Sequence, residues 1–182
     1  MDPLTIAKAS STGASKRGGD NSVVDSLAAF LSMPGYLIRR SKQRSTSIFI
    51  ENCKDFGITP IQFAALTILR LHPAIDQTEL AELASLDSST AGEVIQRLER
   101  RGLLRRQEEG QRRVCELTAD GAALLAEVTP RVADAQRSVL AELTARERVQ
   151  LLRLLSKMNG VGNLHFKPRR RRGLRRRVVR DV

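Results

Sequence analysis

Residues 76–104, DQTELAELASLDSSTAGEVIQRLERRGLL, contain two short helical patterns separated by a tight break. Asp76 is a good N-cap residue, and the apolar residues after it are spaced for one face of a helix of about two turns. Asp87 is a good N-cap for a second helix, and Gly102 supplies its C-terminal stop. Two short helices joined in this way are typical of a helix-turn-helix.

The residues after Gly102 predict a β-hairpin. A polar stretch with Gly110 near its tip separates Leu103-Leu104 from the alternating segment 114–117. Residues 97–113 contain seven Arg and three Glu, a charge suited to phosphates. A helix-turn-helix followed by a basic hairpin predicts a winged helix-turn-helix, whose second helix enters the DNA major groove. The alternative is an ordinary helical hairpin with a solvated arginine surface.

The candidate DNA-contacting residues are polar or cationic and lie in the two short helices and the hairpin. Small hydroxyl side chains at the start of the second helix let the backbone approach DNA and bind base edges or phosphates. We expect the two hairpin arginines to reach the minor groove. The full set is Gln77, Thr78, Ser88, Ser89, Thr90, Gln96, Arg97, Arg112 and Arg113.

Longer helical patterns flank this region. Pro34 suits a first helical position, residues 59–62 read as a capping box, and residues 143–147 read as another. A long pattern follows Thr118, with a kink expected at Pro130. The apolar helices at both ends have no obvious partner within the chain, which suggests a dimer interface.

We therefore expect a mainly α fold with a small β-wing, assembled as an intertwined helical homodimer. The dimerisation helices are expected at 23–56 and 119–158, and the DNA-binding lobe at 59–118. The scarcity of aromatic residues, 3% of the chain, favours aliphatic helix packing over a β-sandwich. The 182 residues suit one domain, 23–158, with a tail at each end.

The charge is concentrated at one end. The chain has a formal net charge of +11, and residues 167–182 hold nine Lys or Arg against one acid. We expect residues 159–182 to form a basic disordered tail, which either binds phosphates without sequence preference or only solubilises the chain. Residues 1–22 show no sustained periodicity and are expected to be disordered.

The sequence resembles the multiple-antibiotic-resistance-regulator (MarR) family of bacterial transcription factors over about residues 31–158. The resembling stretches are MPGYLIRR (33–40), FGITPIQFAALTIL (56–69), HPAIDQTELAELASLDSSTAGEVIQRLERRGLL (72–104) and CELTADGAALL (115–125). The resemblance implies an intertwined dimer that binds a double-stranded DNA operator and is released by a small, often aromatic, acid. MPGYLIRR with HPAIDQ resembles the branch that controls breakdown of aromatic carboxylates, their CoA thioesters or hydroxylated pyridine acids.

Two positions depart from the family pattern. Gln111 precedes the two hairpin arginines where family wings carry Asp, and Ser88 stands where many relatives have Arg. The resemblance also places an effector pocket between the dimer helices and the DNA lobe. Arginines can hold a carboxylate bidentately, and Tyr or His can orient a ring substituent. The candidates are Tyr36, Arg39, Arg40, Gln43 and His72, each of which also has an ordinary structural explanation.

Two alternative functions each rest on one feature of the sequence. Cys53 lies near the end of a dimerisation helix, where a thiol switch would make the chain a redox-sensing repressor. The arginine tail would suit a non-specific, nucleoid-type DNA binder. We expect no cofactor, no metal and no enzymatic activity, because the motifs of hydrolases, phosphate loops and zinc sites are missing. Without an apolar run of membrane length or a leader, we expect a cytoplasmic, nucleoid-associated protein.

Overall fold

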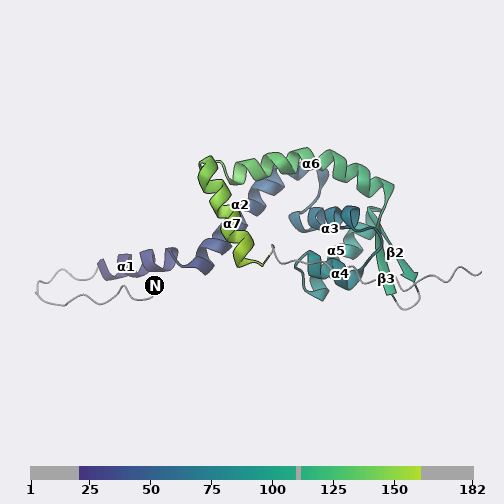
Figure 1. Cartoon of the computed structure of the whole chain (residues 1–182), viewed down its shortest axis with the longest axis horizontal. Coiled ribbons are helices and arrows are strands. Elements are labelled where there is room, and N and C mark those ends of the chain that lie inside the picture. The colour runs from purple at the N-terminus through teal and green to yellow at the C-terminus, as the bar shows by residue number, and fades with distance from the viewer. Residues whose placement is uncertain (1–20, 110–111, 161–182) are drawn as a thin grey trace, which may run out of the picture. The chain divides into compact units, whose positions relative to one another are not determined.

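The computed structural model describes residues 21–109 and 112–160, and it is mainly helical with one three-stranded antiparallel sheet (Figure 1). The elements are α1 (Asn21–Leu31), α2 (Pro34–Cys53), η1 (Lys54–Phe56), α3 (Pro60–Leu71), β1 (Ile75–Asp76), α4 (Gln77–Leu83), α5 (Ser88–Arg100), β2 (Leu104–Glu109), β3 (Arg112–Leu117), α6 (Ala119–Val139) and α7 (Ala145–Met158). The predicted mainly α fold with a β-wing is confirmed. The chain divides into two compact units, 1–139 and 140–182, of which the first contains α1 to α6.

Side-chain caps begin the helices of the first unit where the sequence predicts them. At α3, the Thr59 side chain accepts from the Gln62 amide while the Gln62 side chain accepts from the Thr59 amide, a complete capping box. Asp76 caps α4 through the Thr78 amide, at 2.8 Å. These caps satisfy backbone donors that a helix leaves unpaired, and so they fix where each helix begins.

The sheet has the strand order β1-β3-β2. In the hairpin, Leu104 pairs with Leu117, and the register continues without a bulge to the pair Glu109–Arg112. The hairpin confirms the predicted wing. Strand β1 was not predicted, because it has only two residues, Ile75 and Asp76, and offers no alternation to detect.

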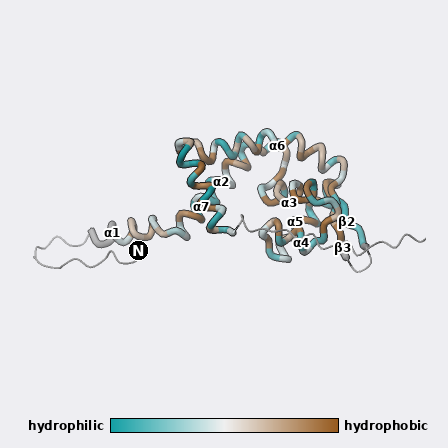
Figure 2. Tube along the Cα trace, in the orientation of Figure 1, coloured by the Kyte–Doolittle hydropathy of each residue, from teal (hydrophilic) through white to brown (hydrophobic). Residues whose placement is uncertain are grey.

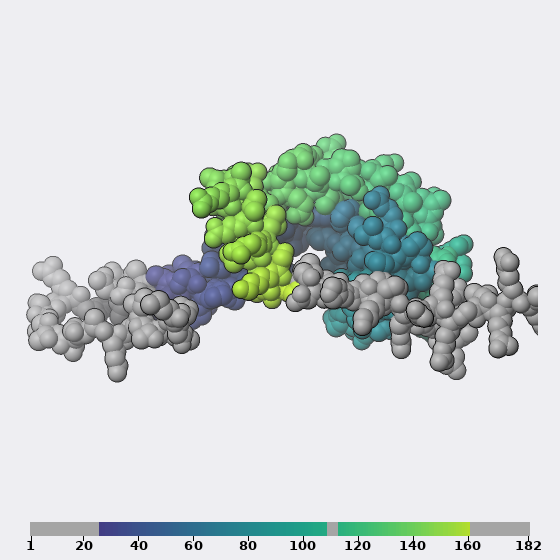
Figure 3. Space-filling view, in the orientation of Figure 1, coloured from purple at the N-terminus to yellow at the C-terminus, as the bar shows by residue number. Residues whose placement is uncertain are grey.

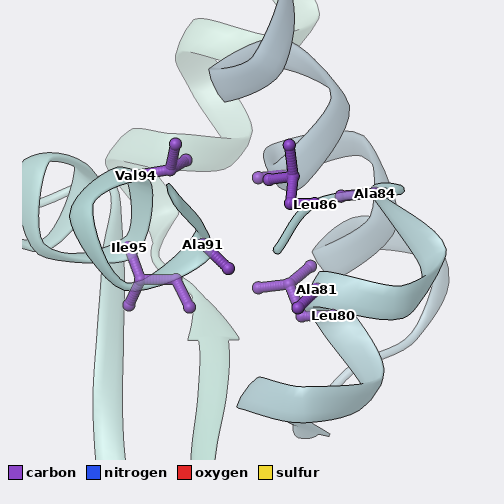
Figure 4. A pocket seen from close by; sticks show the side chains of 8 residues that line it. Leu80, Ala81, Ala84, Leu86, Ala91, Val94 and Ile95 are labelled. Atoms are coloured by element: carbon purple, nitrogen blue, oxygen red, sulfur yellow. The ribbon is translucent and has the colours of Figure 1, made fainter. Parts of the chain in front are cut away.

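Aliphatic side chains from the helices and the sheet form one core. Its fully buried large members are Leu66, Leu69, Leu80, Ile95, Leu98, Leu104, Leu125 and Val128. Hydrophobic residues of α3 and α5 lie side by side in this region (Figure 2). Between α4 and α5, Leu80 and Ala81 lie opposite Ala91 and Ile95 around a small apolar pocket (Figure 4). Alanines at these positions allow the two helices to approach closely.

Helix α6 packs along α2 and forms one side of the first unit (Figure 3). It continues through Pro130 to Val139. Its first turn lies against the start of the wing, where a Cβ on Gly121 would come within 2.0 Å of the Leu103 carbonyl oxygen. Glycine is therefore required at this crossing.

The second unit contains α7, which begins at the predicted capping box. Thr144 accepts from the Glu147 amide, and Glu147 accepts from the Thr144 amide. Large apolar side chains of α7 are exposed, namely Val149, Leu152, Leu154, Leu155 and Met158. In the described part of the chain, no helix has both the length and the apolar character of a membrane span. The predicted tails at 1–22 and 159–182 fall mostly outside the described residues, although α1 already begins at Asn21.

Candidate nucleic-acid interface

Helix α5 has one buried face and one polar exposed face. The buried face consists of Ala91, Val94, Ile95 and Leu98, which pack into the core. The opposite face presents the exposed side chains Ser88, Ser89, Glu93, Gln96, Arg97 and Arg100. A helix that is anchored on one side and polar on the other can present its exposed side chains to a DNA groove.

Asp87 fixes the start of this helix through Thr90. The Asp87 carboxylate accepts from the Thr90 amide at 2.9 Å and from the Thr90 hydroxyl at 2.7 Å. These hydrogen bonds from Thr90 lower the pKa of Asp87. The Thr90 hydroxyl donates its proton to the cap and can only accept a further hydrogen bond, whereas Ser88 and Ser89 are exposed and keep both capacities.

The two candidates at the start of α4 differ in exposure. Thr78 is exposed, and its amide donates to the Asp76 cap. Gln77 is half-buried, and its Oε1 atom is buried without a hydrogen-bond partner among the described residues.

Most of the described arginines of this region are held by the protein itself. Arg105 donates to Glu116 at 2.8 Å, Arg106 pairs with Glu99, and Arg97 lies 3.4 Å from Glu93. Arg113 is exposed on β3, whereas the Arg112 side chain lies outside the described residues. The run of arginines that suggests phosphate binding in the sequence is thus partly a set of structural ion pairs.

The pair Glu99–Arg106 joins α5 to the hairpin. Glu99 lies on α5 and Arg106 on β2, and each side chain is 33% exposed. The hydrogen bond from Arg106 lowers the pKa of Glu99, and the same bond raises the pKa of Arg106. The pair is partly shielded from water and so weighs more than a fully exposed ion pair.

Arg101 makes a second long-range connection. Its guanidinium donates to the carbonyl oxygens of Gly57 at 2.6 Å and Phe56 at 3.1 Å. These carbonyls belong to the turn after α2, in which Gly57 has a φ of 56°. Arg101 thereby ties the end of α5 to the end of α2.

Four of the five candidate effector residues share a stripe of α2. Tyr36, Arg39, Arg40 and Gln43 follow a spacing of three and four residues, which places them on one helix face. Arg40 Nη1 lies 3.4 Å from the Tyr36 hydroxyl oxygen. Tyr36 stacks in a tilted geometry on Phe30 of α1, with ring centroids 4.8 Å apart.

His72 belongs to a different part of the fold. It is the half-buried C-cap residue of α3, where its amide donates to the Ile68 carbonyl. This position gives it a structural task that does not depend on a ligand. It does not lie on the α2 stripe, so the five candidates do not form a single side-chain cluster on one element.

Cys53 lacks the features of a redox switch. Its side chain is 1% exposed, between α2 and α6. Burial raises the pKa of its thiol, an effect that the nearby Arg131 only partly opposes. A peroxide-sensing cysteine needs access and a lowered pKa, and Cys53 has neither in this structure. In the described ranges, no group of three or more His, Cys, Asp or Glu side chains could hold a metal ion.

Sequence reasoning missed three residues of this region. Glu93 and Arg100 lie on the exposed face of α5, and their spacing opposite the buried stripe was a signal that could have identified them. Arg101 had no such signal, because its partners are more than 40 residues away in the chain.

Comparisons with known proteins agree with this geometry. The sequence profile of the MarR family matches residues 58–114. The HTH-type transcriptional repressor NicR of Pseudomonas putida is 38% identical over 127 residues, covering 68% of this chain and 80% of that protein.

Two solved structures are also similar. One is BpsR of Bordetella bronchiseptica, whose DNA binding is regulated by 6-hydroxynicotinic acid. It is 32% identical with a TM-score of 0.68, and the match covers 71% of this chain and 95% of that chain. The transcriptional repressor CouR bound to a 23-mer DNA duplex is 28% identical with a TM-score of 0.65, covering 71% and 94%.

Proposed function

We propose that this chain, which belongs to the MarR family of transcriptional regulators, is a repressor that leaves a pseudo-palindromic operator when a small aromatic acid binds. The family consists of non-enzymatic regulators, and its relatives bear the names of transcriptional repressors. The operator, the homodimer, the site residues and the class of effector are the parts that we propose.

The observation that carries the DNA-binding proposal is the two-sided character of α5. Its buried stripe fixes the helix on the lobe, and its exposed stripe offers Ser89, Gln96 and Arg97 to base edges. Arg113 on the adjacent strand supplies positive charge for the backbone or minor groove. The related repressor CouR has a solved complex with duplex DNA, which supports the same use of the fold here.

A homodimer is supported by the apolar side chains that the single chain leaves exposed. In the first unit these include Leu27 and Phe30 on α1, Leu37 and Ile38 on α2, and Met33 between the two helices, and in the second unit they include five residues of α7. Burial of such surface favours association. Two recognition helices related by a two-fold axis would read half-sites about 10 base pairs apart.

The effector proposal depends on the α2 stripe. Arg39 and Arg40 offer guanidinium groups to a carboxylate, and Tyr36 with its neighbour Phe30 offers aromatic surface to a ring. The regulation of BpsR by 6-hydroxynicotinic acid supports a hydroxylated pyridine carboxylate as the effector class. The acid must bind the DNA-incompetent form better than the competent form, because equal affinity for both would change nothing.

The experiment that tests DNA binding is fluorescence anisotropy with the chain's own upstream DNA and a large excess of unrelated duplex. We expect a complex that survives the competitor. Arg113→Ala should weaken it and reduce the steepness of its salt dependence, while Arg137→Ala on α6 should leave both unchanged. Complete loss of binding under competitor would instead favour the nucleoid-type alternative, with the C-terminal arginines as its binding element.

Effector binding is tested separately by isothermal titration calorimetry with 6-hydroxynicotinic acid and other aromatic acids. We expect Arg40→Ala to reduce the affinity for the acid, because it removes a carboxylate partner. Arg70→Ala, an exposed arginine in the last turn of α3, serves as the matched control. Equal binding by both variants would contradict the proposed α2 site.

A further inference from the structure

Helix α5 carries two acids, and they have different surroundings. Glu99 is one-third exposed and is held by Arg106 of the wing. Glu93 is 65% exposed and lies on the same face as Ser89, Gln96 and Arg97. If this face binds DNA, the Glu93 carboxylate lies near the negatively charged phosphate backbone, so its presence requires an explanation.

The chemistry of the major groove narrows that explanation. A carboxylate accepts hydrogen bonds and donates none, so it gains nothing from phosphate oxygens or from the acceptor edge of guanine. The amino group of cytosine is the major-groove donor that Glu or Asp side chains read. Glu93 lies in the second turn of α5, within the part of a recognition helix that reaches base edges.

Arg97 gives a second, complementary observation. Its Nη2 atom lies 3.4 Å from Glu93 Oε2, one helical turn further along, and its side chain is 60% exposed. Arginine binds the O6 and N7 acceptors of guanine. In the major groove of a G·C pair, the Glu93 carboxylate therefore matches the amino group of cytosine, and the Arg97 guanidinium matches O6 and N7 of guanine.

From this juxtaposition we propose that Glu93 is a specificity-determining residue that selects a cytosine in each half-site of the operator. The inference rests on the proposed function, because it needs α5 to lie in the major groove. Arg97 holds the Glu93 carboxylate in the absence of DNA and turns to the paired or neighbouring guanine in the complex. Glu93 lowers the affinity for half-sites without this cytosine, because its carboxylate then faces the DNA without a hydrogen-bond donor.

The test is selection of preferred duplexes from a randomised library by the full-length chain and by Glu93→Gln. Glutamine has nearly the same shape but binds adenine bidentately. We expect one position of each half-site to change from cytosine to adenine, with a loss of roughly tenfold in discrimination for cytosine there. The other positions should keep their preferences.

The matched control is Glu51→Gln. Glu51 is an exposed acid of α2 that also pairs with a neighbouring cation, Lys54 at 3.4 Å. Both variants remove one negative charge, so a change of base preference that came from net charge alone would appear in both. The change in base preference should appear in Glu93→Gln alone.

Two results would overturn the proposal in distinguishable ways. If the wild-type chain selects no sequence, the proposed function fails together with the inference. If the wild-type chain selects a sequence and Glu93→Gln selects the same one, Glu93 only solvates the helix or holds Arg97, because glutamine still accepts a hydrogen bond from arginine.

Discussion

The Arg101 guanidinium donates to the Gly57 carbonyl oxygen at 2.6 Å, which joins the end of the recognition helix to the turn that follows α2. The α2 stripe holds the proposed effector contacts, and α5 holds the proposed DNA contacts. Arg101 is therefore placed to keep these two elements in one orientation. Its second bond, to Phe56, fixes the fork of the guanidinium and makes the contact bidentate.

Arg101→Ala is expected to lower the stability of the fold by about 1 kcal/mol, because two backbone carbonyls lose their charged donor. For a chain of this size, that corresponds to a decrease of about 2–4 °C in Tm. Arg100→Ala removes the same charge from an exposed position and should leave Tm nearly unchanged. Equal Tm values for the two variants, measured by circular dichroism, would show that the Arg101 contact contributes nothing.

Gly121→Ala is expected to destabilise the chain by about 1–3 kcal/mol, as overpacked sites do. The added Cβ would lie 2.0 Å from the Leu103 carbonyl oxygen and 2.8 Å from Leu117 Cδ1, so α6 must move away from the wing. Gly92→Ala on α5 is the matched variant, because nothing lies within 4 Å of its Cβ position. It should stabilise the helix by about 0.5–1 kcal/mol. Urea denaturation of both variants checks the opposite signs.

The pair Glu99–Arg106 predicts a pH dependence of stability. The pKa of Glu99 is lower in the folded chain than its ordinary value of 4.5, because Arg106 donates to its carboxylate. The stabilisation is therefore present above that ordinary value and is lost as the pH falls through the folded-state pKa. We expect Glu99→Gln to cost about 0.5–1 kcal/mol at pH 7 and progressively less in acid. A cost that stays constant from pH 7 to pH 3 would contradict this assignment.

Cys53 and Cys115 are expected to react slowly with DTNB in the native chain and rapidly in denaturant. Both thiols are buried, and burial raises the pKa of Cys115 to about 11 and also raises that of Cys53. Peroxide should accordingly leave DNA binding unchanged at concentrations that oxidise exposed thiols. Rapid modification of native Cys53 would restore the redox-sensing alternative.

The sequence predicted those features that depend on neighbouring residues. The capping boxes at Thr59 and Thr144 and the cap at Asp87 are signalled within four residues, and the structure confirms all three. Strand β1 escaped prediction because its two residues form a strand only by pairing with β3.

In the candidate interface, too, the sequence predicted features set by neighbouring residues and missed those set by contacts between elements. The exposed serines of α5 follow from helical periodicity, whereas the arginines that the protein holds internally do not. Arg101 donates to carbonyl groups more than 40 residues away, and Arg105 pairs with Glu116 across the hairpin, so the fold itself uses part of the arginine charge that the sequence offers to phosphates. His72 stays a proposed effector residue, and the structure places it at the C-cap of α3, on a different element from Tyr36 and Arg40.

The most direct measurement of the central claim is a gel-shift titration on the chain's own upstream DNA, with excess unrelated duplex and increasing 6-hydroxynicotinic acid or another aromatic acid. The account predicts a specific complex that one acid dissociates in a saturable manner, and that Arg40→Ala renders resistant to the same acid. A complex that persists with every acid of the panel, in the wild-type chain as in the variant, would contradict an aromatic-acid-controlled repressor.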